Sequence, residues 1–153
     1  MRWIIIFGII LLSESVFSQI SDRYCRIAFS KIKKEYSIEP SFIESVPATK
    51  DLRIFTVKRN SSESDYLHIC KAPAKFSTFI FYVLYNSDKK TIKQVSIIHY
   101  TENHGLKVKS RKWLANFVGL KAGELHYGKN VDAVSGSTIS AKSIINKINS
   151  LSY

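Results

Sequence analysis

The chain is short and strongly basic, with 153 residues, a formal net charge of +11 at pH 7 and 45% hydrophobic residues. This length predicts one domain with a hydrophobic core, and the sequence contains no internal repeat or low-complexity tract, which excludes a repeat array. The lysines are spread over the whole chain instead of forming one block. We therefore interpret the charge as a solvated basic surface that favours acidic partners, and we expect no nucleic-acid partner.

The N-terminal segment is typical of a secretory signal peptide. It has Arg2 as a charged start, an apolar run from Trp3 to Leu12, and a small-residue exit before Gln19. The apolar run is shorter than the about 20 residues that cross a bilayer as a helix, although a membrane anchor stays an alternative. We expect residues 1–18 to be the signal peptide of an exported protein, located in the periplasm or cell envelope, either free or associated with a membrane.

The two cysteines, Cys25 and Cys70, would both lie in an oxidising compartment after export, where a disulfide can persist. A bridge between them and two separately buried thiols are both compatible with the sequence, because spacing alone does not fix their distance. No cysteine spacing typical of a metal site is present.

Hydrophobic periodicity predicts an alternation of helices and strands. A helix is expected over 21–35, followed by a connection that contains Pro40 and Pro47. Two hairpins are expected next, with strands over 52–58 and 66–71 in the first and over 76–85 and 91–100 in the second. A helix over 109–118, ended by Gly119, and a last helix after residue 140 follow. We predict an α+β fold, an antiparallel sheet built from hairpins and flanked by helices.

The segment DAVSGSTIS, residues 132–140, places several hydroxyl groups at the start of the C-terminal helix. Gly136 permits a tight turn or a close approach of the backbone to a ligand, and Ser135, Ser137, Thr138 and Ser140 surround it. Free backbone N–H groups and the positive end of the helix dipole favour a phosphate there. By spacing alone, Thr138 also fits an ordinary helix N-cap.

Asp132, Ser135, Gly136, Ser137 and Thr138 follow the pattern DxxSGAT, with serine in place of the usual alanine at position 137. This pattern resembles the flavinylation motif of the FMN-binding domain family, which occurs in the sodium-translocating NADH:quinone reductase, in the Rnf complex and in small exported flavoproteins. A second block, IIHYTENHG over 97–105 followed by RKWLANFVG over 111–119, is similar to the same family. The resemblance covers about residues 75–151, so we divide the chain into a signal peptide (1–18), an N-terminal helix with the first hairpin (19–74) and an FMN-binding core (75–153).

The resemblance implies that a flavin transferase attaches FMN to the Thr138 hydroxyl through a phosphoester bond. It also implies electron transfer with redox partner proteins, soluble or membrane-bound, so we expect an electron carrier and not a stand-alone catalyst. Asp132 is assigned to recognition by the transferase, Glu102 follows a strand where it can reach a ligand, and Trp113 offers a flat apolar wall. The expected cofactor-binding residues are Thr138, Ser137, Gly136, Ser135, Asp132, Ser140, Glu102 and Trp113.

Two other functions are compatible with parts of the sequence. In the first, a secreted module without redox activity binds phosphate or another anion at the SGST turn. In the second, a serine hydrolase uses a hydroxyl near Asp132, but SGST lacks the GxSxG pattern of a nucleophile elbow. His99, His104 and His126 either contact a flavin carbonyl or have structural roles.

Overall fold

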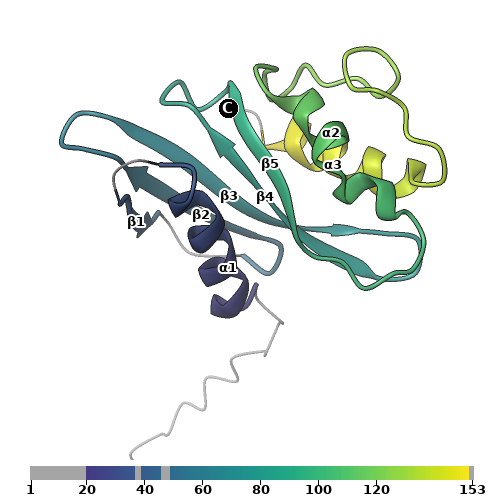
Figure 1. Ribbon diagram of the computed structural model, residues 1–153, viewed down its shortest axis with the longest axis horizontal. Helices are drawn as coiled ribbons and strands as arrows, with labels where there is room; N and C mark the ends of the chain where they lie inside the picture. The colour runs from purple at the N-terminus through teal and green to yellow at the C-terminus, as the bar shows by residue number, and fades with distance from the viewer. Residues whose placement is uncertain (1–19, 37–38, 46–48, 152–153) are drawn as a thin grey trace, which may run out of the picture.

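The computed structural model describes residues 20–36, 39–45 and 49–151, and the predicted signal peptide lies outside these ranges. A sheet with helices on both faces makes up the described part of the chain (Figure 1). The elements are α1 (Asp22–Lys33), β1 (Ser41–Glu44), β2 (Leu52–Lys58), β3 (Ser64–Pro73), β4 (Thr78–Tyr85), β5 (Ile92–His99), the 3-10 turn η1 (Leu106–Lys109), α2 (Arg111–Leu114), the 3-10 turn η2 (Ala115–Phe117) and α3 (Thr138–Ser150).

The sheet has the order β1-β2-β3-β4-β5, and all neighbouring strands are antiparallel. The two predicted hairpins, β2–β3 and β4–β5, are confirmed, and so is the α+β fold class. The structure adds β1, which lies in the connection between Pro40 and Pro47 and pairs with β2. The predicted boundary between the N-terminal part (19–74) and the FMN-binding core (75–153) falls in the turn between β3 and β4. Because β3 pairs with β4, one continuous sheet spans both parts.

The central strand β4 explains why the sheet needs helices on both faces. Its sequence TFIFYVLY is apolar at every position after the first, and all seven of those residues are buried. Successive side chains of a strand point to opposite faces, so Phe79, Phe81 and Val83 enter one core while Ile80 and Tyr82 enter the other. Helix α3, together with α2 and η2, covers the first face, and α1 covers the second (Figure 1).

The helix predicted over 109–118 is not continuous. The structure divides this segment into η1, α2 and η2, each three or four residues long. The Ser110 hydroxyl accepts a hydrogen bond from the Trp113 backbone N–H and so caps α2, which begins at Arg111. Trp113, Leu114 and Phe117 are nevertheless buried, because even these short turns place them on one apolar face.

Cys25 and Cys70 are free thiols on opposite faces of the sheet. Cys25 belongs to the core beneath α1, and Cys70 on β3 belongs to the core beneath α3. Burial raises the pKa of Cys25 to about 11 and that of Cys70 to about 12. Of the two arrangements that the sequence left open, the structure shows the separately buried thiols.

In the described ranges, no helix has the length and apolar character needed to cross a bilayer.

Candidate functional site

The predicted motif borders a depression of about 220 Å³ between the start of α3 and the segment that follows β5. Residues from three parts of the chain line it: Lys75, Tyr100, Glu102, His104, Gly105, Gly136, Ser137, Thr138, Ile139 and Ser140. Five of the eight predicted site residues are therefore brought together, namely Glu102, Gly136, Ser137, Thr138 and Ser140. Ser135, Asp132 and Trp113 do not line the depression.

The start of α3 leaves polar groups available to a ligand. Thr138 is the first helical residue and is exposed, whereas the Ser137 side chain is only 4% exposed and makes no capping hydrogen bond to the helix. Within the described residues the Ser137 hydroxyl has no hydrogen-bond partner, although buried polar groups are nearly always paired. The first backbone N–H groups of a helix also lack partners inside that helix. Hydroxyl and amide groups at this helix end are thus arranged to receive an anion.

Gly136 leaves space in front of the helix. Its φ angle is +76°, in the left-handed region that glycine adopts readily, and no atom lies within 4 Å of where a Cβ would stand. A phosphate group can therefore approach the helix end from this side.

Tyr100 connects the two walls of the depression. Its hydroxyl donates to the His104 carbonyl oxygen at 2.9 Å and lies 2.9 Å from the Ser140 hydroxyl, with which it shares a second hydrogen bond. Gly105 packs against this hydroxyl so closely that a Cβ on residue 105 would be 2.6 Å from it, and the φ angle of Gly105 is +73°. Tyr100, which sequence reasoning missed, therefore fixes α3 against the segment after β5.

Glu102 has a structural partner. Its Oε1 accepts hydrogen bonds from the backbone N–H groups of Phe76 and Ser77, at 2.6 and 2.7 Å, and from the Ser77 hydroxyl at 3.1 Å. Desolvation acts to raise the pKa of Glu102, but the hydrogen bonds outweigh it and the pKa is lowered. The carboxylate thus holds the β3–β4 turn at the rim of the depression and stays charged at neutral pH.

Trp113 supports the motif from below. Its side chain is 6% exposed, and its indole N–H donates to the Asp132 carbonyl oxygen at 2.9 Å. The Tyr127 hydroxyl accepts from the Val134 N–H at 3.0 Å and donates to the Thr138 hydroxyl at 3.4 Å. These contacts hold the loop before α3, while the side chain of Asp132 is exposed.

An exposed apolar rim lies beside the depression. Phe76, in the turn that Glu102 holds, is 72% exposed, and its ring centre is 6.3 Å from that of His104. Ile139, on the first turn of α3, is 51% exposed and lines the depression. The sequence prediction placed Phe76 inside a strand, but β4 begins only at Thr78, which leaves the ring in solvent.

The site combines two features. The start of α3 suits a phosphate group, and the apolar rim beside it suits an apolar part of the same ligand. Residues 77–151 match the model of the family described as the FMN-binding domain. This segment is therefore an FMN-binding domain, and FMN is its cofactor.

The crystal structure of NqrC from Shewanella oneidensis has a similar fold. The TM-score is 0.55 at 23% sequence identity, and the match covers 69% of this chain and 61% of NqrC. At this identity the likeness establishes the fold alone. No curated protein sequence matches the chain.

The residues present fit FMN in two ways. The unpartnered Ser137 hydroxyl, the free helix end and the space at Gly136 suit its phosphate. The depression is smaller than the about 300 to 1,000 Å³ of pockets that enclose a whole ligand, so its size suits a phosphate group. No group of acidic, histidine or cysteine side chains in the described ranges is arranged to hold a metal ion.

Proposed function

We propose that the protein is an exported flavoprotein that carries FMN covalently on Thr138 and transfers electrons between partner proteins. The observation that carries the proposal is the exposed Thr138 hydroxyl on the first turn of α3, next to the unpartnered hydroxyl of Ser137. Bound FMN supplies the redox chemistry, and the chain supplies attachment and orientation. The proposal includes a flavin transferase, redox partners that are soluble or membrane-bound, and removal of residues 1–18 during export to the periplasm or cell envelope.

Attachment replaces the phosphoanhydride bond of FAD with a phosphoester bond to the protein. The Thr138 oxygen bonds to the FMN phosphorus of FAD, the pyrophosphate bond of FAD breaks, AMP leaves, and the hydroxyl proton passes to the medium. The Tyr127 hydroxyl, 3.4 Å from the Thr138 oxygen, orients the nucleophile. The helix dipole and free N–H groups then stabilise the negative charge of the phosphodiester. The exposed Asp132 carboxylate is available to the transferase that performs the step.

Replacement of Thr138 tests the attachment. The protein purified from a host with an active flavin transferase is expected to carry FMN on the peptide that contains Thr138, as shown by mass spectrometry. Thr138→Ala should lose all covalent flavin because no hydroxyl remains, whereas Thr138→Ser should retain it. An unmodified Thr138 in such a host would contradict the proposal and favour the alternative, a non-redox module that binds phosphate or another anion reversibly at the same turn.

The apolar rim is suited to the flavin ring. A ring anchored by its phosphate to Thr138 needs a flat apolar surface within reach. Ile139, which lines the depression, and Phe76, beside the lining residue His104, provide exposed apolar area. Trp113 does not serve as this wall, because its side chain is buried beneath the loop. The ring edge then stays near solvent, where a partner protein can approach it.

Replacement of Phe76 tests this placement. Phe76→Ser is expected to leave covalent flavin intact and to increase quenching of the flavin fluorescence by iodide, because one apolar wall is lost. Val118→Ser is the matched control, since Val118 is also exposed, at 53%, but lines a different hollow, whereas Phe76 lies against Lys75 and His104 of the depression. Equal quenching in the wild type and in Phe76→Ser would rule out contact between Phe76 and the ring.

A further inference from the structure

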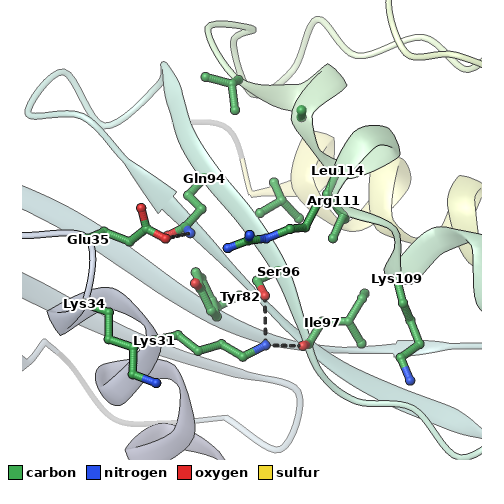
Figure 2. A pocket seen from close by; sticks show the side chains of 13 residues that line it. Lys31, Lys34, Glu35, Tyr82, Gln94, Ser96, Ile97, Lys109, Arg111 and Leu114 are labelled. Carbon is green, nitrogen blue, oxygen red and sulfur yellow. Dashed lines mark hydrogen bonds between the residues drawn. The ribbon is translucent and has the colours of Figure 1, made fainter.

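A second hollow, larger than the first, follows the edge of the sheet. It has a volume of about 730 Å³ and lies between α1 on one side and η1, α2 and η2 on the other (Figure 2). We name it the edge groove, and its lining residues are Lys31, Lys34, Glu35, Tyr82, Gln94, Val95, Ser96, Ile97, Lys109, Arg111, Leu114, Ala115 and Val118. None of them lines the depression at Thr138.

The floor of the edge groove is the outer edge of β5. Four consecutive residues of this strand, 94–97, line it, although successive side chains of a strand point to opposite faces. The groove therefore runs along the strand edge and not over one face. In the described part of the chain no other strand pairs with this side of β5, and only Ile92 at its start exchanges hydrogen bonds with residues 119 and 120.

The walls of the edge groove are positively charged. Lys31, Lys34, Lys109 and Arg111 line it together with a single carboxylate, Glu35. Arg111 points toward the middle of the groove, and Lys34 and Lys109 lie on opposite sides of it (Figure 2). Burial and the nearby charge of Lys109 lower the pKa of Lys31. Such an accumulation of like charge is relieved by a negatively charged occupant.

Buried polar atoms in the floor lack partners. Tyr82 is 0% exposed, and in the described ranges its hydroxyl makes no hydrogen bond of good geometry, although it interacts weakly with the Ser96 hydroxyl. The same holds for the side-chain carbonyl of Gln94, whose amide nitrogen donates to Glu35 at 3.3 Å. One of these atoms is a donor and the other an acceptor, so the floor matches an occupant that offers both kinds of group.

We propose that the edge groove binds an extended, acidic polypeptide segment of a partner protein. Extended peptides commonly bind to sheets by adding a strand at a free edge, with backbone N–H and C=O groups that serve as donors and acceptors. The acidic side chains of the segment pair with Lys34, Lys109 and Arg111, while apolar side chains contact Leu114 and Val118. Without an occupant, Lys31 lies at the strand edge, where its Nζ donates to the Ser96 hydroxyl at 3.0 Å and to the Ile97 carbonyl at 2.9 Å. A carboxylate of the bound segment would accept hydrogen bonds from this ammonium group instead.

The edge groove lies close to the flavin site. Gly105 lines the depression, and Lys109, the last residue of η1, lines the groove. The rise from Gly105 to Lys109 along this 3-10 turn is about 8 Å. A segment bound in the groove would hold its protein next to the flavin ring. This connection rests on the proposed electron transfer, but binding in the groove does not.

A binding experiment tests the proposal with a labelled short peptide that alternates glutamate with valine. Fluorescence anisotropy is measured with wild-type protein that carries flavin and with Thr138→Ala protein that lacks it. We expect saturable binding to both, weakened by salt, and no binding of a peptide that alternates lysine with valine. Because the flavin-free protein is included, failure of the groove and failure of flavin attachment are distinguishable.

Two sets of charge substitutions locate the peptide. The combined variant Lys34→Gln, Lys109→Gln and Arg111→Gln removes three exposed cations of the groove and should weaken binding about tenfold.

The matched control removes three exposed lysines elsewhere: Lys58→Gln, Lys90→Gln and Lys121→Gln. It changes the net charge equally and should leave binding within about twofold of wild type. Equal weakening by both sets would show attraction to the general surface charge and overturn the proposal. The groove cations could instead bind phosphatidylglycerol vesicles or inorganic phosphate and not the peptide. That result would overturn the proposal that the occupant is a polypeptide segment.

Discussion

Gly105→Ala is expected to destabilise the protein by about 3 to 4 kcal/mol. The left-handed backbone at φ +73° costs a residue with a side chain about 1 to 2 kcal/mol. The new Cβ would also be 2.6 Å from the Tyr100 hydroxyl, which must then leave its hydrogen bonds to His104 and Ser140, at about 1 kcal/mol each. Urea unfolding, followed by circular dichroism, measures the change.

Gly128→Ala separates the two contributions. Its φ angle is +74°, but no atom lies within 4 Å of the position that a Cβ would take, so only the backbone cost of about 1 to 2 kcal/mol is expected. Displacement of Tyr100 should also reduce flavin incorporation in Gly105→Ala, because Tyr100 holds Ser140 at the depression. Equal losses of stability in the two variants would show that the contact between Gly105 and Tyr100 contributes nothing.

Acid is expected to remove about 3 kcal/mol of stability through His68 alone. His68 on β3 is 2% exposed, and burial lowers its pKa from 6.5 to about 4. As the pH falls below 6.5, the unfolded chain binds a proton that the folded protein excludes, so stability decreases. The decrease continues until the pH reaches about 4, where the folded protein also binds the proton, and it stops below that value.

The variant His68→Phe isolates this effect. Phenylalanine keeps a ring against Tyr85, 4.8 Å away between ring centres, and has no proton to bind. The difference in unfolding free energy between wild type and variant should shift by about 3 kcal/mol between pH 7 and pH 4. Replacement of the exposed His126 by glutamine controls for the loss of a histidine. A difference that does not depend on pH would show that the pKa of His68 is the same in the folded and unfolded states.

The regular elements of the fold were predictable because local chemistry and tertiary structure agree. The strand over 52–58 alternates in character and has the predicted bounds. The turn between β4 and β5 is held by Asp88, whose carboxylate accepts from the N–H groups of Lys90 and Thr91, at the end of the predicted stretch 86–90. Such interactions lie within a few residues and are visible in a sequence.

Elements stabilised by distant contacts were missed or misjudged. β1 is four residues long and mostly exposed, so it carries no hydrophobic pattern, and it exists through its pairing with β2. The helix over 109–118 has the apolar spacing of a continuous helix, but the Ser110 cap and the bond from the Asn116 side chain to the Trp113 carbonyl divide it.

The motif at 135–138 was legible in the sequence because its residues are consecutive. Tyr100 and Phe76 were not, since distant contacts place them. Tyr100 reaches α3 through its hydrogen bond to Ser140, and Glu102 holds the turn of Phe76 beside the segment after β5. The sequence did offer one sign of Tyr100, because it lies within the block over 97–105 that ends in Gly105, a glycine that a close contact requires.

The placement of the two cysteines has a consequence for biogenesis. The sheet keeps Cys25 and Cys70 apart, and both are neutral thiols at physiological pH. They are the chain's only cysteines, so no covalent cross-link holds this fold together. Folding needs neither an oxidant nor a disulfide isomerase, and the same native state is accessible in a reducing cytoplasm and in an oxidising envelope.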